Sequence, residues 1–249
     1  MAGHSHSSNI AARKGAVDKK RMRAFTKVAR AIMSAVKQGG PDPDANLKLK
    51  YAIEKARAAN VPKDNIERVI KKAAGEKGGS LDELTYEGYA AGGVALIVVC
   101  LTDNRARTAP DVKYIFDRNG GNLGAPGSVA FMFSFRSIVA VERDGRSDDQ
   151  LLELGLEAGA DDVQIEGDFA TLLAPPTEFI ALKAALEQRG AKLASAEIGY
   201  VPQTTIPVAD KEAAKRVLHL IDELEENEDV QSVYANYDMP GEWIAELAG

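Results

Sequence analysis

The spacing of apolar residues changes near residue 80, and this change divides the chain into two parts of different character. Before residue 75, apolar residues recur every three or four positions, as they do on one face of an α-helix. After residue 80, short apolar runs typical of strands alternate with helical segments. Residues 75–80 are rich in glycine and predict a flexible linker between the two parts. We therefore expect an α+β fold that begins with an all-helical domain.

Residues typical of helix ends predict three helices in the first part. Asp18 and Asp44 are of a residue type that caps helix N-termini, and the pair Gly39 and Gly40 is a strong helix stop. Pro62 suits the first turn of a third helix. The predicted helices cover residues 19–38, about 44–60, and 62–75.

Two groups of elements are predicted in the second part. The first group has strands at residues 84–89, 94–101 and 129–135, with a helix from about 108 to 120. The second group restarts after Ser137 with strands at residues 138–141, 163–166, 169–173 and 193–200 and helices at residues 148–158 and 176–189. Its order, β-α-β-β-α-β, is that of ferredoxin-like domains.

A last helix near residues 209–226 and a strand at residues 230–237 complete the pattern, followed by a tail. Because the first group lacks a closing helix and strand, we predict that this last pair belongs to it and that the second group is inserted between them. The predicted fold is an N-terminal helical domain followed by two ferredoxin-like α/β domains, the third inserted in the second. The predicted domains are residues 1–77, residues 81–136 plus 201–241, and residues 137–200.

Composition excludes several classes of protein. The chain has 249 residues, 45% of them hydrophobic and 27% charged, as in ordinary globular domains. The longest apolar run, residues 94–101, is too short to cross a membrane, and residues 1–12 do not resemble a secretory signal. A single cysteine, Cys100, excludes a disulfide framework and a thiolate zinc site. We expect a soluble, cytoplasmic protein.

Charge is distributed very unevenly. The whole chain has a formal net charge of −6, but residues 1–77 hold 18 basic and 7 acidic residues, a net charge of +11. The remainder holds 13 basic and 30 acidic residues, a net charge of −17. Such a division indicates a polyanionic partner for the basic part, while the acidic part discourages unspecific binding to the same polyanion.

The first predicted helix carries a basic ridge opposite an apolar stripe. The apolar stripe consists of Phe25, Val28, Ala29, Ile32 and Val36. The ridge consists of Lys20, Arg23, Lys27, Arg30 and Lys37, on the other side of the helix. Most charged helix faces are simply solvated, but this one contains no acidic residue to offset its repulsion. We predict phosphate contacts at Arg13, Lys14, Lys19, Lys20, Arg21, Arg23, Lys27 and Arg30.

The first twelve residues are small and polar, so we expect them to order only against a partner. If the initiator methionine is removed, an N-terminal Ala2-Gly3-His4 could bind Cu(II) or Ni(II), with His6 nearby, but this chemistry is adventitious in most proteins that carry it. We predict no functional metal and no cofactor.

Motifs shared with one known protein family are spread over nearly the whole chain, and several are too long to match by chance. They are Met1-Ala2-Gly3-His4-Ser5, Arg13-Lys14-Gly15, Phe25-Thr26-Lys27, Gly39-Gly40-Pro41-Asp42-Pro43-Asp44-Ala45-Asn46, Val61-Pro62-Lys63-Asp64-Asn65-Ile66, Tyr86-Glu87-Gly88-Tyr89, Thr102-Asp103-Asn104-Arg105, Gly120-Gly121-Asn122-Leu123-Gly124, Asp229-Val230-Gln231 and Val233-Tyr234. On these motifs the chain resembles the YebC family, which includes mitochondrial translational activators of cytochrome oxidase. One departure is His6-Ser7, where the family usually has Lys-Trp, so a tail contact that relies on that charge and ring is not supported.

The resemblance implies a helical first domain and two α/β domains, the third inserted in the second. It also implies one of two functions. Bacterial members are generally described as DNA-binding transcriptional regulators, while other members act on translation in association with the ribosome. The resemblance therefore leaves both DNA and ribosomal RNA open as partners.

Residues that would suit an enzyme have simpler structural interpretations. Asp103-Asn104-Arg105 favours a turn into a helix, with Arg105 paired locally, over a catalytic acid. The glycines at residues 120–124 precede a strand, whereas phosphate-binding loops follow one. His219 and Cys100 suit packed or edge positions, so a nucleophilic triad has almost no candidates. We predict that the protein is not an enzyme.

The sequence thus predicts a nucleic-acid-binding regulator of gene expression. No helix-turn-helix spacing is evident, so recognition of structured ribosomal RNA is a close alternative to DNA binding. The acidic residues at positions 222–229 predict a solvated helix end, or else a surface for cations or a basic protein partner.

Overall fold

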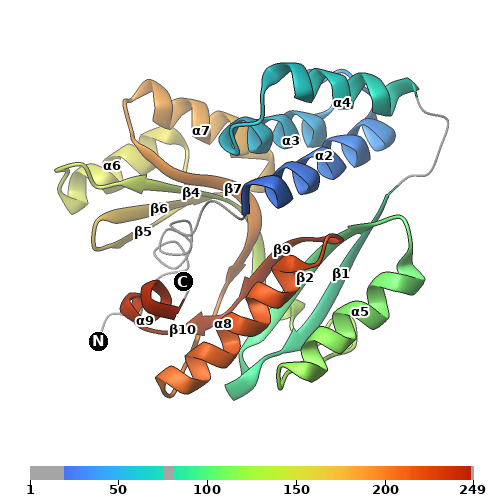
Figure 1. The fold of residues 1–249 in the computed structure, drawn as a ribbon. Helices are drawn as coiled ribbons and strands as arrows, with labels where there is room; N and C mark the ends of the chain where they lie inside the picture. The colour runs from blue at the N-terminus through green and yellow to red at the C-terminus, as the bar shows by residue number, and fades with distance from the viewer. Residues whose placement is uncertain (1–19, 76–80, 248–249) are drawn as a thin grey trace.

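The structure is a computed structural model that describes residues 20–75 and 81–247, with side chains described from residue 24 onward. It is an α+β fold in which three helices precede two four-stranded antiparallel sheets and a two-stranded parallel pair (Figure 1). The helices lie beside both larger sheets (Figure 1). The predicted fold class is therefore confirmed.

The helical domain consists of α2 (Lys20–Gly39), α3 (Leu47–Ala58) and α4 (Lys63–Gly75). Val28, Ile32 and Val36 of α2 are buried against α3 and α4, as the apolar stripe predicted. Phe25 is different: it is 37% exposed, so its prediction as a core residue is wrong. It lies one turn before Val28, near the end of the packed part of the helix.

The connection between α2 and α3 is held by Asn46. Its side chain accepts a hydrogen bond from the Leu49 amide at 3.1 Å and donates to the carbonyl oxygens of Ala35 and Gly40, both at 2.8 Å. Asn46 is thus the N-cap of α3, and the prediction of Asp44 in this role is wrong. A Cβ atom at Gly39 would lie 2.7 Å from the Asn46 side chain, which explains why a glycine ends α2.

The four-stranded sheet of the second domain has the strand order β3-β1-β2-β9. Its strands are β1 (Asp82–Tyr89), β2 (Ala95–Thr102), β3 (Asn122–Leu123) and β9 (Val230–Ala235). The helices α5 (Arg105–Arg118) and α8 (Lys211–Glu226) pack on one face of this sheet. Because β9 pairs with β2, the C-terminal helix and strand join the first group, as the sequence predicted.

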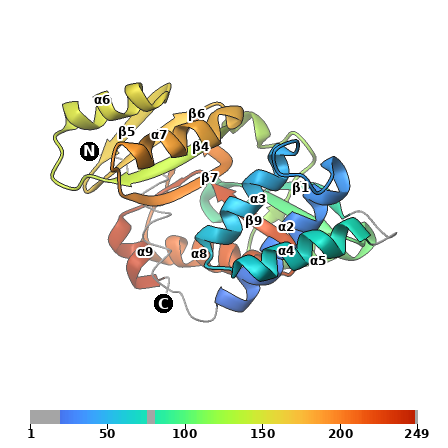
Figure 2. The ribbon, with the colours of Figure 1, turned by 90° about the horizontal axis from the view of Figure 1, so that it is seen from above.

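The inserted segment forms the other sheet, with the order β5-β6-β4-β7. Its elements are β4 (Phe133–Glu142), α6 (Asp148–Ala158), β5 (Asp162–Glu166), β6 (Phe169–Ala174), α7 (Phe179–Gln188) and β7 (Leu193–Pro202). Both helices cover one face of this sheet (Figure 2). The predicted β-α-β-β-α-β order is confirmed, and β4 and β7 both extend past the predicted domain limits at residues 137 and 200. The limits themselves remain a prediction.

The predicted strand at residues 129–135 is wrong. Ala130–Met132 form a 3₁₀ turn, and Phe133 begins the single long strand β4. The reason is the buried carboxylate of Glu87, which accepts hydrogen bonds from the amides of Val129 and Ala130 at 2.7 and 2.8 Å and so removes them from any strand ladder. The strand that follows α5 is instead the short β3.

The C-terminal end is more structured than predicted. The strand expected to reach residue 237 ends at Ala235, and β10 (Tyr237–Asp238) pairs separately with β8 (Ile206–Pro207). Asn236 between them accepts a hydrogen bond from the Ala95 amide at 2.7 Å. The helix α9 (Gly241–Leu247) occupies the predicted tail. Among the residues that the structure describes, no helix is long and apolar enough to cross a membrane.

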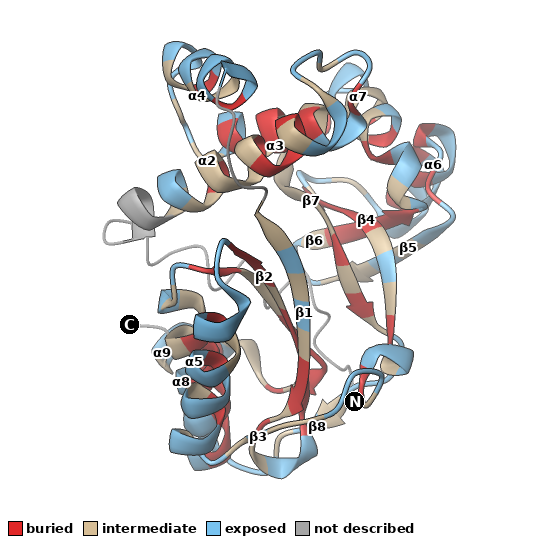
Figure 3. Ribbon diagram, turned by 90° about the vertical axis from the view of Figure 1, so that its right-hand side faces the viewer, coloured by how far each residue is buried: buried red, intermediate tan, exposed pale blue. Residues whose placement is uncertain are grey.

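Buried residues gather on the strands and on the helix faces that contact them, while the outer helix faces are exposed (Figure 3). Cys100 is one of these core residues, as predicted. Burial, together with the Asp229 charge, raises the pKa of its thiol to about 12, so it stays protonated at neutral pH.

Candidate nucleic-acid interface

The eight predicted phosphate contacts fall into three groups. Three lie outside the described residues: Arg13, Lys14 and Lys19. Three lie at the start of α2, where the side chains are not described: Lys20, Arg21 and Arg23. The last two, Lys27 and Arg30, have described side chains, and these point toward the second domain.

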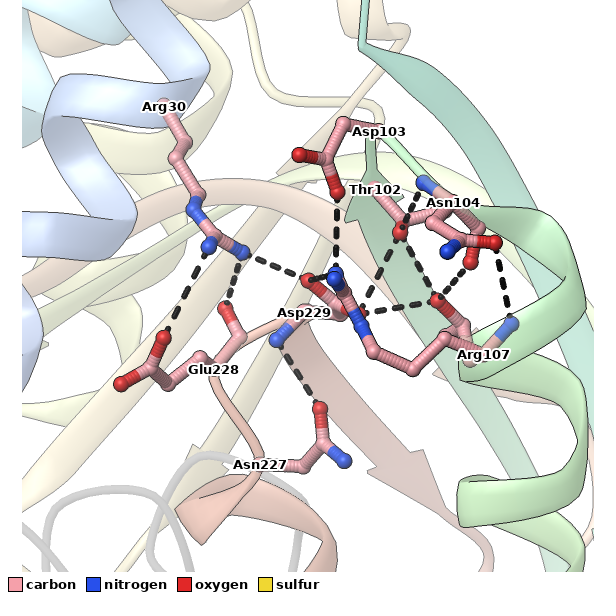
Figure 4. Close-up of polar contacts among 9 residues, drawn as sticks. Arg30, Thr102, Asp103, Asn104, Arg107, Asn227, Glu228 and Asp229 are labelled. Atoms are coloured by element: carbon pink, nitrogen blue, oxygen red, sulfur yellow. Dashed lines mark hydrogen bonds and ion pairs between the residues drawn. The ribbon is translucent and has the colours of Figure 1, made fainter.

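Lys27 and Arg30 hold α2 against the C-terminal end of α8 and the turn that follows it. The Lys27 ammonium donates to the backbone carbonyl of Glu225 at 2.7 Å. Arg30 donates to the carbonyl of Glu228 at 2.9 Å and to the Asp229 carboxylate at 2.7 Å (Figure 4). The acidic segment at residues 222–229 is therefore not only a solvated helix end, because part of it binds the basic helix of the same chain.

Asp229 is the centre of this contact and is only 3% exposed. Besides Arg30, Arg107 donates to both of its carboxylate oxygens at 3.1 and 2.9 Å. The hydroxyls of Thr102 and Thr108 donate at 3.2 and 2.9 Å (Figure 4). Burial alone raises the pKa of the Asp229 carboxyl, but the hydrogen bonds from Arg107, Thr108 and Arg30 outweigh burial and leave the pKa below its usual range.

The motif at residues 102–105 has the turn role that the sequence favoured. The Asn104 side chain accepts from the Arg107 amide and caps α5, which begins at Arg105, three residues earlier than predicted. Arg105 pairs with Asp82 at 2.6 Å, and Asp103 pairs with Arg107 at 2.9 Å. Arg105 and Arg107 are thus both ion-paired within the chain.

Two further glycine-containing motifs connect β1 to the loop before β4 and to the residues that lead into β3. Glu87 accepts from the amides of Gly127, Val129 and Ala130, which fixes the loop before β4. A Cβ atom at Gly121 would lie 2.6 Å from the Tyr89 carbonyl oxygen, so the glycine permits close approach of the backbones. The motif does lead from helix to strand, but the turn is confined to its glycines, because Asn122 and Leu123, expected in the turn, form the strand β3.

A cleft of about 450 Å³ lies where the helical domain and both sheets meet. Its walls come from α2, α3, β1, β2, β4, β7 and β9. Aromatic rings line it: Phe135 stands opposite Tyr200 in the β4–β7 register with ring centroids 5.0 Å apart, and Tyr200 is 5.4 Å from Tyr234. Tyr51 of α3 also lines it. These residues are far apart in the sequence, and no sequence motif joins them.

The α3 wall of the cleft is anchored on the inserted domain. The Tyr51 hydroxyl accepts from the Ile198 amide at 2.9 Å, and Glu54 pairs with Lys183 of α7 at 2.5 Å. Lys48 and Lys55, two turns apart on α3, line the same cleft. Lys48 pairs with Glu83 across it at 3.3 Å, while Lys55 has no ion-pair partner among the described residues.

A metal site finds no support in the described part of the chain, where no cluster of three or more His, Cys, Asp or Glu residues is arranged to hold an ion. His219 is exposed on α8. His4 and His6, with the departure at Ser7, lie outside the described residues.

Comparison with known families decides where the chain belongs. The model of the TACO1/YebC protein N-terminal domain matches residues 5–76, and that of the TACO1/YebC second and third domain matches residues 81–237. The chain belongs to the TACO1/YebC family. The predicted resemblance is therefore confirmed over nearly its full length.

TACO1/YebC relatives with curated names are similar from end to end. A probable transcriptional regulatory protein of Rubrobacter xylanophilus is 47% identical over 251 residues, covering 100% of each chain. One from Treponema pallidum is 48% identical, covering 98% of this chain and 100% of the relative. The crystal structure of the conserved hypothetical protein Aq1575 from Aquifex aeolicus is 42% identical, with a TM-score of 0.80 over 91% of this chain and 94% of that one.

Proposed function

We propose that this TACO1/YebC protein is a non-enzymatic regulator of gene expression that binds nucleic acid through its helical domain. The observation that carries the proposal is the charge division, with a net charge of +11 in residues 1–77 and −17 in the remainder. Positive charge concentrated in one domain is the electrostatic signature of phosphate binding. The acidic α/β domains would orient the helical domain or meet a protein partner.

The positions of Lys27 and Arg30 refine this proposal. Lys27 is held by the end of α8 and Arg30 by the turn that follows, so phosphate could reach them only if these contacts exchange. We therefore assign the first phosphate contacts to the segment that precedes them: Arg13, Lys14, Lys19, Lys20, Arg21 and Arg23. Lys27 and Arg30 would then act in a different way, by fixing the orientation of α2 relative to the α/β domains.

Duplex DNA is the first candidate partner, because the curated relatives are named probable transcriptional regulatory proteins. Ribosomal RNA is the second candidate, and one observation of the fold favours it. The cleft beside α3 exposes the ring of Phe135, and structured RNA offers unpaired bases that stack on such a ring, whereas duplex DNA does not.

A direct comparison of the two partners tests the proposal. The full chain is titrated into duplex DNA in a gel-shift assay and co-sedimented with ribosomes, both at the same physiological salt concentration. Sequence-dependent DNA binding with weak ribosome binding supports transcriptional regulation. Tight ribosome binding with weak, sequence-indifferent DNA binding supports action on translation. Absence of binding to both contradicts the proposal.

A further inference from the structure

We propose that the cleft between the three domains binds an unpaired nucleobase of a single-stranded nucleic-acid segment. The inference rests on the proposed function and extends it, because the sequence of α2, which carries the predicted phosphate contacts, contains a single aromatic residue, Phe25, which is 37% exposed. The rings that stack would come instead from the α/β domains.

The geometry of the rings supports this assignment. Phe135 is 51% exposed although it sits within the long strand β4, where large apolar side chains are otherwise buried. Its neighbour Tyr200 packs in turn against Tyr234, so the three rings form one continuous aromatic cluster with Phe135 at its exposed end. An exposed aromatic ring is the platform on which proteins stack unpaired bases.

Polar groups in the cleft match the other parts of a nucleotide. Tyr200 has no hydrogen-bond partner for its hydroxyl among the described contacts, so this group is free to bind a base edge. Lys48 and Lys55 project from the same face of α3; Lys48 pairs with Glu83, and Lys55 can contact a flanking phosphate. With Glu83 as the only acidic side chain that lines the described cleft, the lining carries one net positive charge.

This charge decides between two kinds of ligand. An aromatic cleft with excess acidic residues would favour a cation, such as a lysine or arginine side chain of a partner. Here Lys48 already neutralises Glu83, and Lys55 adds a positive charge, which favours an aromatic group that carries a phosphate. A cleft of about 450 Å³ is also within the range of small-molecule sites, roughly 300–1,000 Å³, but cannot admit a duplex.

The test compares two strands that differ only in their bases. Fluorescence anisotropy measures the binding of the full chain to a short single-stranded oligothymidylate and to a strand of the same length made of abasic sites. We expect the thymidylate strand to bind more tightly. Phe135→Ala should remove this preference and weaken thymidylate binding by roughly 5- to 150-fold, the effect of losing one base–aromatic stack.

Two variants control for indirect effects. Phe131→Ala removes the same side chain four residues earlier, where it is 69% exposed and outside the cleft, and should leave binding unchanged. Tyr200→Phe keeps the ring and removes only the hydroxyl, so it should weaken thymidylate binding less than Phe135→Ala does. A strand with 5-iodouracil should photocrosslink to Phe135 or Tyr200.

The outcomes separate this inference from the proposed function. If neither strand binds, the nucleobase site is refuted, while the gel-shift and ribosome assays still decide the proposed function. If both strands bind equally, or if Phe135→Ala and Phe131→Ala behave alike, nucleic-acid binding stands but the nucleobase site is refuted. Crosslinks confined to α4 or to other surfaces would refute the site as well.

Discussion

Asp229→Asn is the substitution that most directly perturbs the contact between the helical domain and the second domain. It keeps the size of the side chain but removes its charge, and it turns one acceptor oxygen into an NH₂ group that faces donors. Arg30, Arg107, Thr102 and Thr108 all donate to this carboxylate. Thr102 and Thr108 are fully buried, so no water can replace the lost carboxylate oxygen as the acceptor of their hydrogen bonds.

The expected loss of stability follows from the burial of these groups. Breaking a buried ion pair from one side costs about 3–5 kcal/mol. The side chains of Arg30 and Arg107 are 23% and 46% exposed, so both guanidinium groups can be partly rehydrated. We therefore expect Asp229→Asn to lower the free energy of unfolding by about 2–3 kcal/mol and Tm by roughly 4–12 °C.

Urea unfolding followed by circular dichroism measures the difference. Asp117→Asn is the matched control, because Asp117 pairs with Lys113 on the exposed face of α5 and should matter by less than about 0.5 kcal/mol. A loss for Asp229→Asn as small as that of the control would refute the reasoning.

The pH dependence gives an independent check. Because hydrogen bonds hold the pKa of the Asp229 carboxyl below its usual range, its stabilisation is complete above the unfolded-state pKa of about 3.9. It is lost as the pH falls through the lower folded-state pKa. The gap between wild type and Asp229→Asn should be constant near neutrality and shrink below about pH 4; a gap that persists in acid would contradict this account.

Two further substitutions test how family motifs hold the fold. Glu87→Gln weakens three hydrogen bonds from backbone amides to a buried carboxylate, so it should lower the free energy of unfolding by about 1–3 kcal/mol. Its control is Glu83→Gln, which removes one partner of an exposed ion pair and should change the free energy of unfolding little. Equal urea midpoints for both variants would contradict the role of Glu87. Gly39→Ala places a Cβ atom 2.7 Å from Asn46, whose three hydrogen bonds prevent it from moving away, so we expect a loss of about 1–3 kcal/mol. Gly75→Ala, in open space at the end of α4, is its control and should be nearly neutral in thermal unfolding; similar losses at both sites would exclude the clash as the cause.

Much of the fold could be predicted because its signals are local. The cap residue Ser147 and the left-handed Gly159 fix α6 at the bounds that the sequence predicted. The hairpin between β5 and β6 turns at Gly167, again as expected. The insertion could be inferred because each α/β domain needs a complete set of strands to bury its helices.

What could not be predicted depends on contacts between distant residues. The strand expected at residues 129–135 is prevented by Glu87, more than forty residues earlier in the chain. Lys27 and Arg30 share a helical face with the rest of the ridge, but only the fold shows that this face meets Asp229. Helical periodicity gives the faces of α2 and does not say which partner each face will meet.

The same limit applies to the candidate site. A basic N-terminal domain is visible in the distribution of charge along the chain. The aromatic cleft is not, because Tyr51, Phe135, Tyr200 and Tyr234 come from α3 and three strands and converge only when all three domains pack. Aromatic residues that are scattered in the sequence look like ordinary core residues.

The most direct test of the central claim is the salt dependence of nucleic-acid binding. Each phosphate contact contributes about 0.7–0.9 to the slope of log affinity against log salt concentration. Replacing Lys20, Arg21 and Arg23 by alanine should therefore reduce the slope by about 2–3, whereas replacing Lys63, Arg68 and Lys71 on α4 removes the same charge from the same domain and should change it little. An unchanged slope for the α2 variant, or an equal reduction for both variants, would contradict phosphate binding by this helix.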